Sequence, residues 1–333
     1  MERRPRLIAM LLALTLAGAV ALGGCSRKPD RARSATGGSD GFPVTVRDAQ
    51  GTAVTVAQRP RRIASLAPTV TEILFAIGAG DRVVAVAEPA DYPPEAARLP
   101  RLGGWFTPSA EKTLAAEPDL VVASRGNPPE FLATLRKSGC VVFAVDPRSL
   151  ETITTTIRDI GRLVGAQEGA ERAVARMREH LNSVARRIGD VPDSRRPTAF
   201  LIVGINPVWT AGSETFQDDA LRAAGAHNVG ADRAGFHPFG TESLLAADPD
   251  YLVVSTMEGA PDRMKQQVLA DPALRRLTAA REGRIVVLEA NHIMRPGPRL
   301  VYAVEAMARA FYPDRFAESR KQLTHTGRGS ADP

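Results

Sequence analysis

A pattern of sixteen residues occurs twice in this chain, and the two copies lie 131 residues apart. The first copy covers residues 109–124, the second covers 240–255, and eight of the sixteen positions are identical. Each copy reads as a short Ala-rich helix, a Pro-Asp turn and an apolar strand. Internal similarity of this kind predicts two lobes of the same construction. The alternative is that unrelated helix-turn-strand units share one composition by convergence.

Short apolar strands alternate with helical patterns along the rest of the chain. Residues 42–57 alternate apolar and polar side chains around a polar turn at 48–51, which predicts a β-hairpin. Residues 62–66 read as a buried strand, and 69–72 have the capping-box pattern of a helix start. Such an order predicts mainly parallel sheets covered on both faces. We therefore expect an α/β protein with two Rossmann-like lobes.

The middle of the chain carries almost no strand signal. Within it, residues 168–187 repeat apolar side chains at helical spacing, and a helix of that length spans roughly 30 Å at about 1.5 Å per residue. A polar, Pro-containing stretch follows before a new apolar strand starts at Thr198. We place an N-terminal lobe at 42–148, a helical linker at 149–190, a C-terminal lobe at 191–318 and a polar tail at 319–333.

The first residues predict export. Three arginines precede an apolar stretch at 7–22, which is short for a membrane span of about 20 residues and typical of a secretory signal at 1–24. The following Gly-Gly-Cys25 resembles the lipobox of bacterial lipoproteins, so we expect cleavage before Cys25 and its lipidation. An ordinary signal peptide and an uncleaved anchor are the alternatives. Residues 25–41 have the composition of a flexible tether.

Cysteine content and charge exclude other classes. The chain holds only Cys25 and Cys140, which is too few for a disulfide framework, and we expect Cys140 to be a small core residue. The net charge of +6 is spread along the chain. A nucleic-acid partner requires a concentrated basic face, so we expect no nucleic acid among the partners.

Several segments resemble the cobalamin-binding proteins of ABC importers, which belong to a wider group that binds iron-siderophores, haem and corrinoids. The resemblance runs from about residue 61 to 312. It implies two α/β lobes joined by one rigid helix, with the ligand in a cleft between the lobes and little closure. The matching segments are 63–78, 91–94, 117–122, 125–127, 204–207 and the helix after Pro298-Arg299.

The resemblance also implies partners and an attachment to the membrane. The implied partners are a permease dimer and its ATPase subunits, and we expect a monomer held to the membrane only by its lipid. Glu111 and Glu242 occupy matching positions of the repeat, near a helix start where the helix dipole favours a carboxylate. Capping is one interpretation of these residues. The resemblance implies another, that both carboxylates dock onto arginines of the permease.

Aromatic residues are the main candidates for contacting the ligand. Trp105, Trp209 and Phe236 fall where the resemblance places rings against a corrin macrocycle, and both tryptophans lie in loop-like segments at strand ends. The alternative is that the tryptophans are core residues. Pro89 and Ser124 stand where cobalamin binders carry aromatic residues. Further candidate ligand-binding residues are Tyr92, Arg125, Asn127, Asn206, His237, His292 and Arg295.

The ligand class remains open within this group. We expect cobalamin, as a transported ligand and not as a resident cofactor, with haem or a ferric siderophore as alternatives. Haem favours a Tyr or His ligand, and His237 and His292 lie in loops where either could contact a ligand or its metal. An anionic catecholate siderophore requires arginines, for which Arg125 and Arg295 are the candidates. We expect no metal site of the protein's own.

Two other classes of protein are disfavoured. The sequence lacks a Gly-x-Ser-x-Gly elbow, a His-Glu-x-x-His motif, a Walker loop and a dinucleotide fingerprint, so we do not expect an enzyme. A structural envelope protein has no use for tryptophans in exposed loops.

Overall fold

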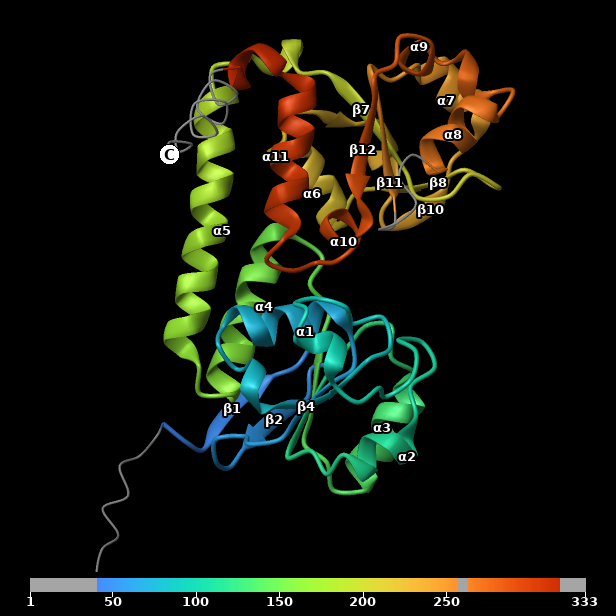
Figure 1. Ribbon diagram of the computed structural model, residues 1–333. Helices are drawn as coiled ribbons and strands as arrows, with labels where there is room; N and C mark the ends of the chain where they lie inside the picture. The colour runs from blue at the N-terminus through green and yellow to red at the C-terminus, as the bar shows by residue number, and fades with distance from the viewer. Residues whose placement is uncertain (1–40, 257–262, 318–333) are drawn as a thin grey trace, which may run out of the picture. The chain divides into compact units, whose positions relative to one another are not determined.

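Residues 41–256 and 263–317 are described by the structure, a computed structural model (Figure 1). They belong to one compact unit, Asp40–Pro333. The predictions for the signal sequence, the tether, Cys25 and the tail at 319–333 fall outside the described ranges. Within those ranges, no helix is long and apolar enough to cross a membrane.

The N-terminal lobe begins with the predicted hairpin. β1 (Val44–Arg47) and β2 (Ala53–Val56) pair antiparallel, which confirms the prediction for residues 42–57. A parallel four-stranded sheet follows, in the spatial order β4-β3-β5-β6. Its strands are β3 (Ile63–Ser65), β4 (Val83–Val86), β5 (Leu120–Ser124) and β6 (Val142–Val145).

Helices α1 (Pro68–Ala76), α2 (Ala110–Ala115) and α3 (Pro129–Lys137) cover this sheet. The predicted capping box at the start of α1 is wrong. The N-cap is Ala67, and no side chain caps the first turn. Pro68 at the start of the helix has no N–H to satisfy. Glu72 turns away from the helix start to two arginines of the C-terminal lobe.

The C-terminal lobe contains a second parallel four-stranded sheet, in the order β12-β11-β7-β9. A small two-stranded antiparallel sheet, formed by β8 (Trp209–Ala211) and β10 (Phe236–Pro238), completes the lobe. The helices are α6 (Phe216–Ala223), α7 (Thr241–Ala247), α8 (Arg263–Ala270), α9 (Thr278–Arg281), α10 (Ala290–Ile293) and α11 (Leu300–Phe311). The sheet strands are β7 (Thr198–Ile202), β9 (His227–Asn228), β11 (Tyr251–Thr256) and β12 (Ile285–Glu289).

The two sheets share one topology. Counted along the chain within each lobe, the strands lie in the order second, first, third, fourth. The sequence repeat supplies the third strand of each sheet, β5 and β11, and the helix before it, α2 and α7. Both copies place a non-glycine residue at positive φ just before the Pro-Asp turn, Glu117 at 45° and Asp248 at 36°. The prediction of two similarly built lobes is therefore confirmed in backbone detail.

The repeated Pro-Asp turn has a structural role in each lobe. The carboxylate of Asp119 accepts hydrogen bonds from the backbone N–H groups of Arg61 and Arg62, just before the first strand. The carboxylate of Asp250 accepts bonds from the backbone and hydroxyl of Thr198, where the first strand of the other sheet begins. In both lobes the aspartate thus ties the start of the third strand to the start of the first.

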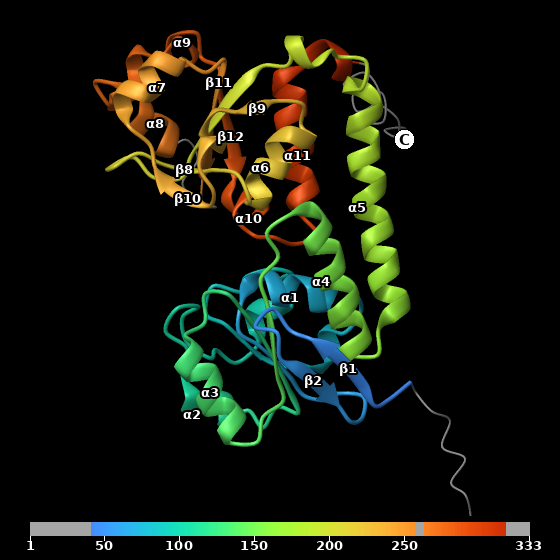
Figure 2. The same cartoon turned by 180° about the vertical axis from the view of Figure 1, so that it is seen from behind.

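Two helices connect the lobes. α4 (Leu150–Leu163) begins with a capping box at Ser149, and α5 (Gln167–Ile188) matches the helix predicted at 168–187. α5 runs alongside α11 and also contacts α1, so it packs on both lobes (Figures 1 and 2). The remaining regular segments are short 3₁₀ turns at Gly80–Arg82, Ala96–Arg98, Asp193–Arg195, Val229–Asp232, Leu274–Arg276 and Pro313–Phe316.

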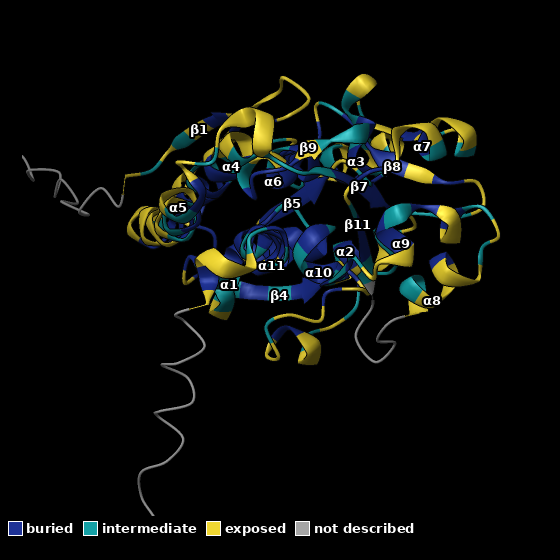
Figure 3. Cartoon of the chain, turned by 90° about the horizontal axis from the view of Figure 1, so that it is seen from above, coloured by how far each residue is buried: buried dark blue, intermediate teal, exposed yellow. Residues whose placement is uncertain are grey.

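The core divides according to the faces of the two sheets. Strand side chains alternate, so Leu120 of β5 enters a large cluster with α1 and α5, while Val121 enters a second cluster with α3. In the C-terminal lobe, Val253 joins the same large cluster and Leu252 joins a third one with α8. The large cluster therefore continues from one lobe into the other, and Figure 3 shows strands of both sheets mostly buried. Cys140, expected in the core, is half-buried at the edge of the second cluster.

Candidate functional site

The carboxyl ends of the two sheets face each other. The loop after β4 carries Pro89 and Asp91, and the segment after β12 carries Asn291 and Arg295. Arg295 donates to the Asp91 carboxylate at 2.7 Å and to the Pro89 carbonyl at 3.1 Å, and Asn291 lies 3.5 Å from Asp91. In open α/β sheets, ligands bind beyond the carboxyl ends of the strands where the strand order reverses. The region between these two edges is therefore the candidate site.

Trp105 lies at this edge of the N-terminal sheet. Its indole N–H donates to the hydroxyl of Ser124, the last residue of β5, at 2.9 Å. Its backbone carbonyl accepts a bond of 2.8 Å from the side chain of Asn127. The ring is half-buried and packs against the large apolar cluster. One part of the Trp105 side chain thus packs against the core, and the rest is accessible to solvent.

Trp209 and Phe236 lie at the corresponding edge of the C-terminal lobe. Trp209 follows β7 and exchanges backbone hydrogen bonds with Val203 and Gly204 at its end. In the β8–β10 sheet, Trp209 pairs with Pro238, and Phe236 pairs with Ala211. The two aromatic side chains share the outer face, with 38% and 44% of their surfaces exposed. Large side chains at diagonal positions on one face of an antiparallel pair can contact each other, so the β8–β10 sheet presents a joint aromatic surface.

Alternation along β10 places His237 on the opposite face. Only 4% of the residue is exposed, and its Nε2 and Nδ1 atoms lie 3.0 and 3.2 Å from the carbonyls of Gly230 and Pro238. Asn127 is also buried and bonds to backbone groups of Ser124, Leu66 and Trp105. Both side chains support the loops around the aromatic residues. Neither offers a free polar atom to a ligand at this edge.

A buried ion cluster links the two lobes. The Glu72 carboxylate, on α1, accepts two bonds from Arg299 at 2.8 and 2.7 Å and one from Arg295 at 2.9 Å. The Arg299 guanidinium also stacks on the ring of Tyr92 at 3.8 Å. Burial alone lowers the pKa of Arg299, but the hydrogen bonds and charge of Glu72 outweigh it and raise the pKa. Sequence patterns missed this role of Glu72 because they favoured a helix cap.

Arg295 and Tyr92, both candidate ligand contacts, are thus engaged in the contact between the lobes. Arg125 differs, because 66% of its side chain is exposed and Asp146 lies 4.0 Å away. Asn206 is exposed and lines a cavity of about 520 Å³ in the C-terminal lobe, together with Phe239 and Thr241. Arg125, Asn206 and Tyr92 are exposed, although Arg299 stacks on the Tyr92 ring, whereas Arg295 is largely buried.

His292 lies on α10, next to the ion cluster. Its Nε2 atom is 3.2 Å from the Glu289 carboxylate, and its ring contacts Tyr302. Burial lowers the pKa of His292, against the opposing charge of Glu289, so the imidazole is neutral at neutral pH. In residues 41–256 and 263–317, no group of three or more His, Cys, Asp and Glu side chains could hold a metal ion.

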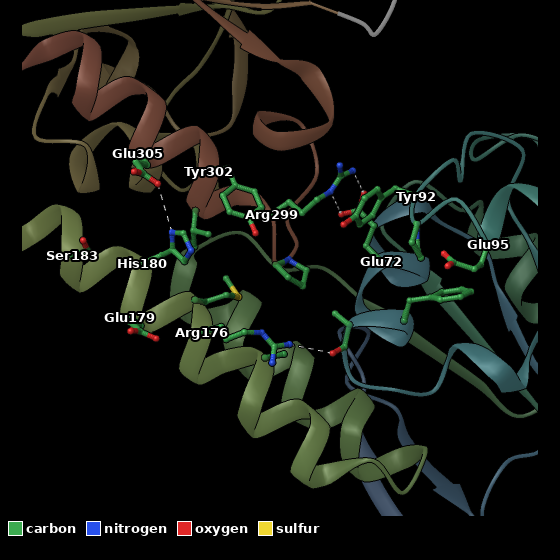
Figure 4. Close-up of a pocket in the computed structure, with 17 residues that line it drawn as sticks. Glu72, Tyr92, Glu95, Arg176, Glu179, His180, Ser183, Arg299, Tyr302 and Glu305 are labelled. Carbon is green, nitrogen blue, oxygen red and sulfur yellow. Dashed lines mark hydrogen bonds and ion pairs between the residues drawn. The ribbon is translucent and has the colours of Figure 1, made fainter. Parts of the chain in front are cut away.

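A second cavity lies on the side of the molecule that α5 covers. It has a volume of about 750 Å³ and is bounded by α1, α5 and α11. Figure 4 shows His180 of α5 directed toward Glu305 of α11, 3.7 Å away, and Arg299 directed toward Glu72. Trp105, Trp209 and Phe236 are not among its lining residues. We therefore base the candidate site on the exposed aromatic rings and on the sheet edges, since cavity size does not single out that region.

Glu111 and Glu242 are exposed in the first turns of α2 and α7. In both lobes this helix leads into the third strand of the sheet, so the two carboxylates occupy equivalent places in the fold. Figures 1 and 2 both show α2 and α7 on the side away from α5. The arrangement offers one acidic residue from each lobe on one side of the molecule.

Comparison with known proteins identifies relatives that match along most of the chain. A family described as periplasmic binding protein matches residues 63–292. The ABC transporter substrate-binding lipoprotein YvrC of Bacillus subtilis is 30% identical over 312 residues, which cover 92% of this chain and 98% of YvrC. A cobalamin-binding protein of Halobacterium salinarum is 30% identical over 316 residues, covering 92% of this chain and 84% of that protein.

Solved structures of the same fold have different ligands in their descriptions. The haem-binding protein RhuT of Roseiflexus sp. RS-1 has a TM-score of 0.68 and 30% identity, covering 77% of this chain and 99% of RhuT. The vitamin B12-binding protein BtuF of Vibrio cholerae has a TM-score of 0.63 and 28% identity, covering 76% of this chain and 96% of BtuF. A protein of an ABC-type Fe³⁺-hydroxamate transport system from Saccharomonospora viridis has a TM-score of 0.68 and 27% identity, covering 81% of this chain and 99% of that protein.

Proposed function

Because the chain belongs to the periplasmic binding protein family, we propose that it binds cobalamin between the carboxyl edges of its two sheets. It is a substrate-binding protein of an ABC importer, with a role in transport and not in catalysis. It works with a permease and its ATPase, and members of this family act outside the cytoplasm. The proposal concerns which ligand it carries and how.

The observation that carries the proposal is the pair of aromatic surfaces at the two edges. Trp105 comes from the N-terminal lobe, and Trp209 and Phe236 come from the C-terminal lobe. A flat macrocycle offers a large apolar face, and aromatic side chains bury such a face at low entropic cost. Rings on both edges suit a ligand that is held from two sides.

The polar groups at the edges favour cobalamin over haem. Haem iron is held by an axial protein ligand, commonly His or Tyr. His237 is buried against carbonyls, and the Nε2 atom of His292 lies 3.2 Å from the Glu289 carboxylate, so neither histidine is free for this role. Tyr92 is exposed, but Arg299 stacks on its ring. The cobalt of cobalamin already has its ring nitrogens and needs no protein ligand. The named relative from Halobacterium salinarum agrees with this choice.

Haem is the second candidate, because a haem-binding protein shares 30% identity with this chain. A ferric siderophore is the third, and Arg125 is its available cation. The three ligands differ in colour and mass, so one experiment distinguishes them. Purified protein that lacks residues 1–24 is titrated separately with cyanocobalamin, haem and a ferric hydroxamate, and binding is followed by visible absorbance and native mass spectrometry.

We expect a one-to-one complex with cyanocobalamin and weaker or no binding of the other two ligands. Leu269→Ala is the control for nonspecific apolar binding, because Leu269 is an exposed apolar side chain on α8. Stoichiometric haem binding with a Soret shift, and no complex with cyanocobalamin, would replace cobalamin by haem. Turnover of any bound ligand would overturn the transport role itself.

We also infer how the protein meets its partners. Glu111 and Glu242, one per lobe, would pair with arginines of the permease, since Arg–carboxylate contacts fix orientation as well as affinity. Lipid on Cys25 would hold a monomer at the membrane, with residues 25–41 as its tether. Metabolic labelling with a fatty-acid analogue tests the anchor, and labelling that persists in Cys25→Ala would exclude it.

A further inference from the structure

Phe106 is the most exposed of the large hydrophobic residues in the described part of the chain, with 65% of its surface open. It directly follows Trp105, at the carboxyl edge of the N-terminal sheet. Trp105 packs against the large apolar cluster, whereas Phe106 contacts the Trp105 ring at a centroid distance of 4.7 Å and a tilt of 30°. The phenyl ring therefore rests on the indole ring and not in the core.

The loop that carries both rings is closed on itself. Gly103 and Pro108 form an isolated antiparallel bridge, and the backbone of Ser109 donates to the Leu102 carbonyl at 2.8 Å. Gly103 has a φ of 98°, and a side chain there would meet the Thr107 carbonyl at 2.9 Å. Only glycine takes this conformation without strain. The residues between the two ends of the bridge are thus held in one short, tight loop.

The Trp105 ring is held in place by Ser124 at the end of β5 and by the two residues Gly126 and Asn127 after this strand. Ser124 accepts the bond of its indole N–H, which leaves the ring with no free donor. Gly126 leaves the space that the ring fills, because a Cβ atom there would lie 2.4 Å from the indole Nε1 and Cε2 atoms. Asn127 holds the backbone carbonyl of Trp105. Ring, N–H and backbone are each held by a different neighbour.

We propose that Phe106 joins Trp105 as a second ligand-contacting ring of the N-terminal lobe, and that Ser124 positions both rings through its bond to the Trp105 indole. The proposal rests on the function proposed above. An exposed phenyl ring on a rigid indole base offers a flat apolar face that needs little further ordering on binding. With the indole N–H bonded to Ser124, Trp105 and Phe106 together select for an extended ring face and contribute no hydrogen-bond donor of their own.

The first test is the affinity for cyanocobalamin of Phe106→Ala against that of Leu269→Ala. Both remove an exposed apolar side chain, and neither residue is buried in the core. Loss of one aromatic contact of about 0.5–1.5 kcal/mol corresponds to a Kd increased roughly 2- to 10-fold. We expect that increase for Phe106→Ala, a smaller loss for Phe106→Leu, and an unchanged Kd for Leu269→Ala. An unchanged Kd for Phe106→Ala overturns the contact.

The second test needs no ligand. The chain has two tryptophans, so a ¹H–¹⁵N spectrum contains two indole N–H signals, and Trp209→Phe identifies the signal of Trp105. We expect faster hydrogen exchange at the Trp105 indole in Ser124→Ala, and restored protection in Ser124→Thr, which keeps the hydroxyl. Cyanocobalamin affinity should fall and recover in the same order. Equal exchange in all three proteins overturns the positioning role of Ser124.

The two tests separate this inference from the proposed function. Failure of the wild-type protein to bind cyanocobalamin rejects cobalamin as the ligand, and with it the ligand contact of Phe106. Tight binding by the wild-type protein and by Phe106→Ala alike rejects the contact alone. Circular dichroism of each variant confirms that a lower affinity does not come from unfolding.

Discussion

The Glu72→Gln substitution tests whether the buried ion cluster holds the two lobes together. Glu72 is the only carboxylate that reaches both arginines within the described residues, and its side chain is 2% exposed, against 12% for Arg295 and for Arg299. Glutamine has the same shape but no charge, and it offers one acceptor oxygen in place of two. The substitution therefore leaves two buried guanidinium groups with one compensating charge, on Asp91.

Breaking a buried ion pair by removing one partner costs about 3–5 kcal/mol, because the remaining charge stays buried without compensation. For a unit of this size, each 1 kcal/mol lowers Tm by about 2 °C, so we expect a decrease of roughly 6–10 °C. The matched control is Glu305→Gln on α11. Glu305 is half-buried, pairs with Arg309 one turn away and lies 3.7 Å from His180, and an i,i+4 helix pair contributes about 0.3–0.5 kcal/mol.

Thermal unfolding of the three proteins is followed by circular dichroism at pH 7. Glu72→Gln should unfold several degrees below the wild type, and Glu305→Gln within about 1 °C of it. Equal Tm values for both variants would refute the reasoning, since Glu72 would then contribute no more than the Glu305–Arg309 pair. A double variant with Arg299→Met should recover part of the loss, because it also removes one uncompensated charge.

Three further predictions concern pH, partner and ligand. Burial raises the pKa of Asp91, but the hydrogen bond and charge of Arg295 outweigh it and hold the pKa below its usual 3.8. The contribution of this carboxylate to stability is therefore complete above that pH and is lost as the pH falls through the lower folded-state pKa. The free energies of urea unfolding of Asp91→Asn and of the wild type should converge as the pH is lowered below 3.8. Glu111→Ala combined with Glu242→Ala should leave cyanocobalamin affinity intact and cut uptake in cells, and an equal loss of affinity would argue against docking. Trp209→Ala should weaken cyanocobalamin binding by about 0.5–1.5 kcal/mol, measured by calorimetry, and an unchanged Kd would place the ring outside the site.

Local sequence patterns predicted individual strands and helices well, because these elements form from interactions between residues that are near each other in the sequence. The alternation in residues 42–57 and the helical spacing in 168–187 each report on neighbours in sequence, and both segments formed the expected elements. The repeat went further, since copies of one helix-turn-strand unit took the same place in two sheets. The pairing of β8 with β10 was not predicted, because α6 and β9 lie between these two strands in the sequence.

Side-chain roles across the lobes were harder to predict. The pattern around Glu72 is the same for a helix cap as for an ion pair with residues more than 220 positions away. His237 and Phe236 are neighbours in a loop-like segment, and only the pairing of β10 shows that one points inward and the other outward. Sequence alone placed the aromatic residues near strand ends, but contacts between distant segments decided which polar side chains remain available.

The single covalent passage between the lobes has a mechanical consequence. Along the described ranges, the chain crosses from one sheet to the other once, through α4 and α5, and α5 packs on helices of both lobes along its 22 residues. A continuous helix without proline curves only gently, and α5 contains none. We therefore expect the two lobes to move little relative to one another in the free protein. If the ligand lies between them as proposed, its release would depend on the permease separating the lobes.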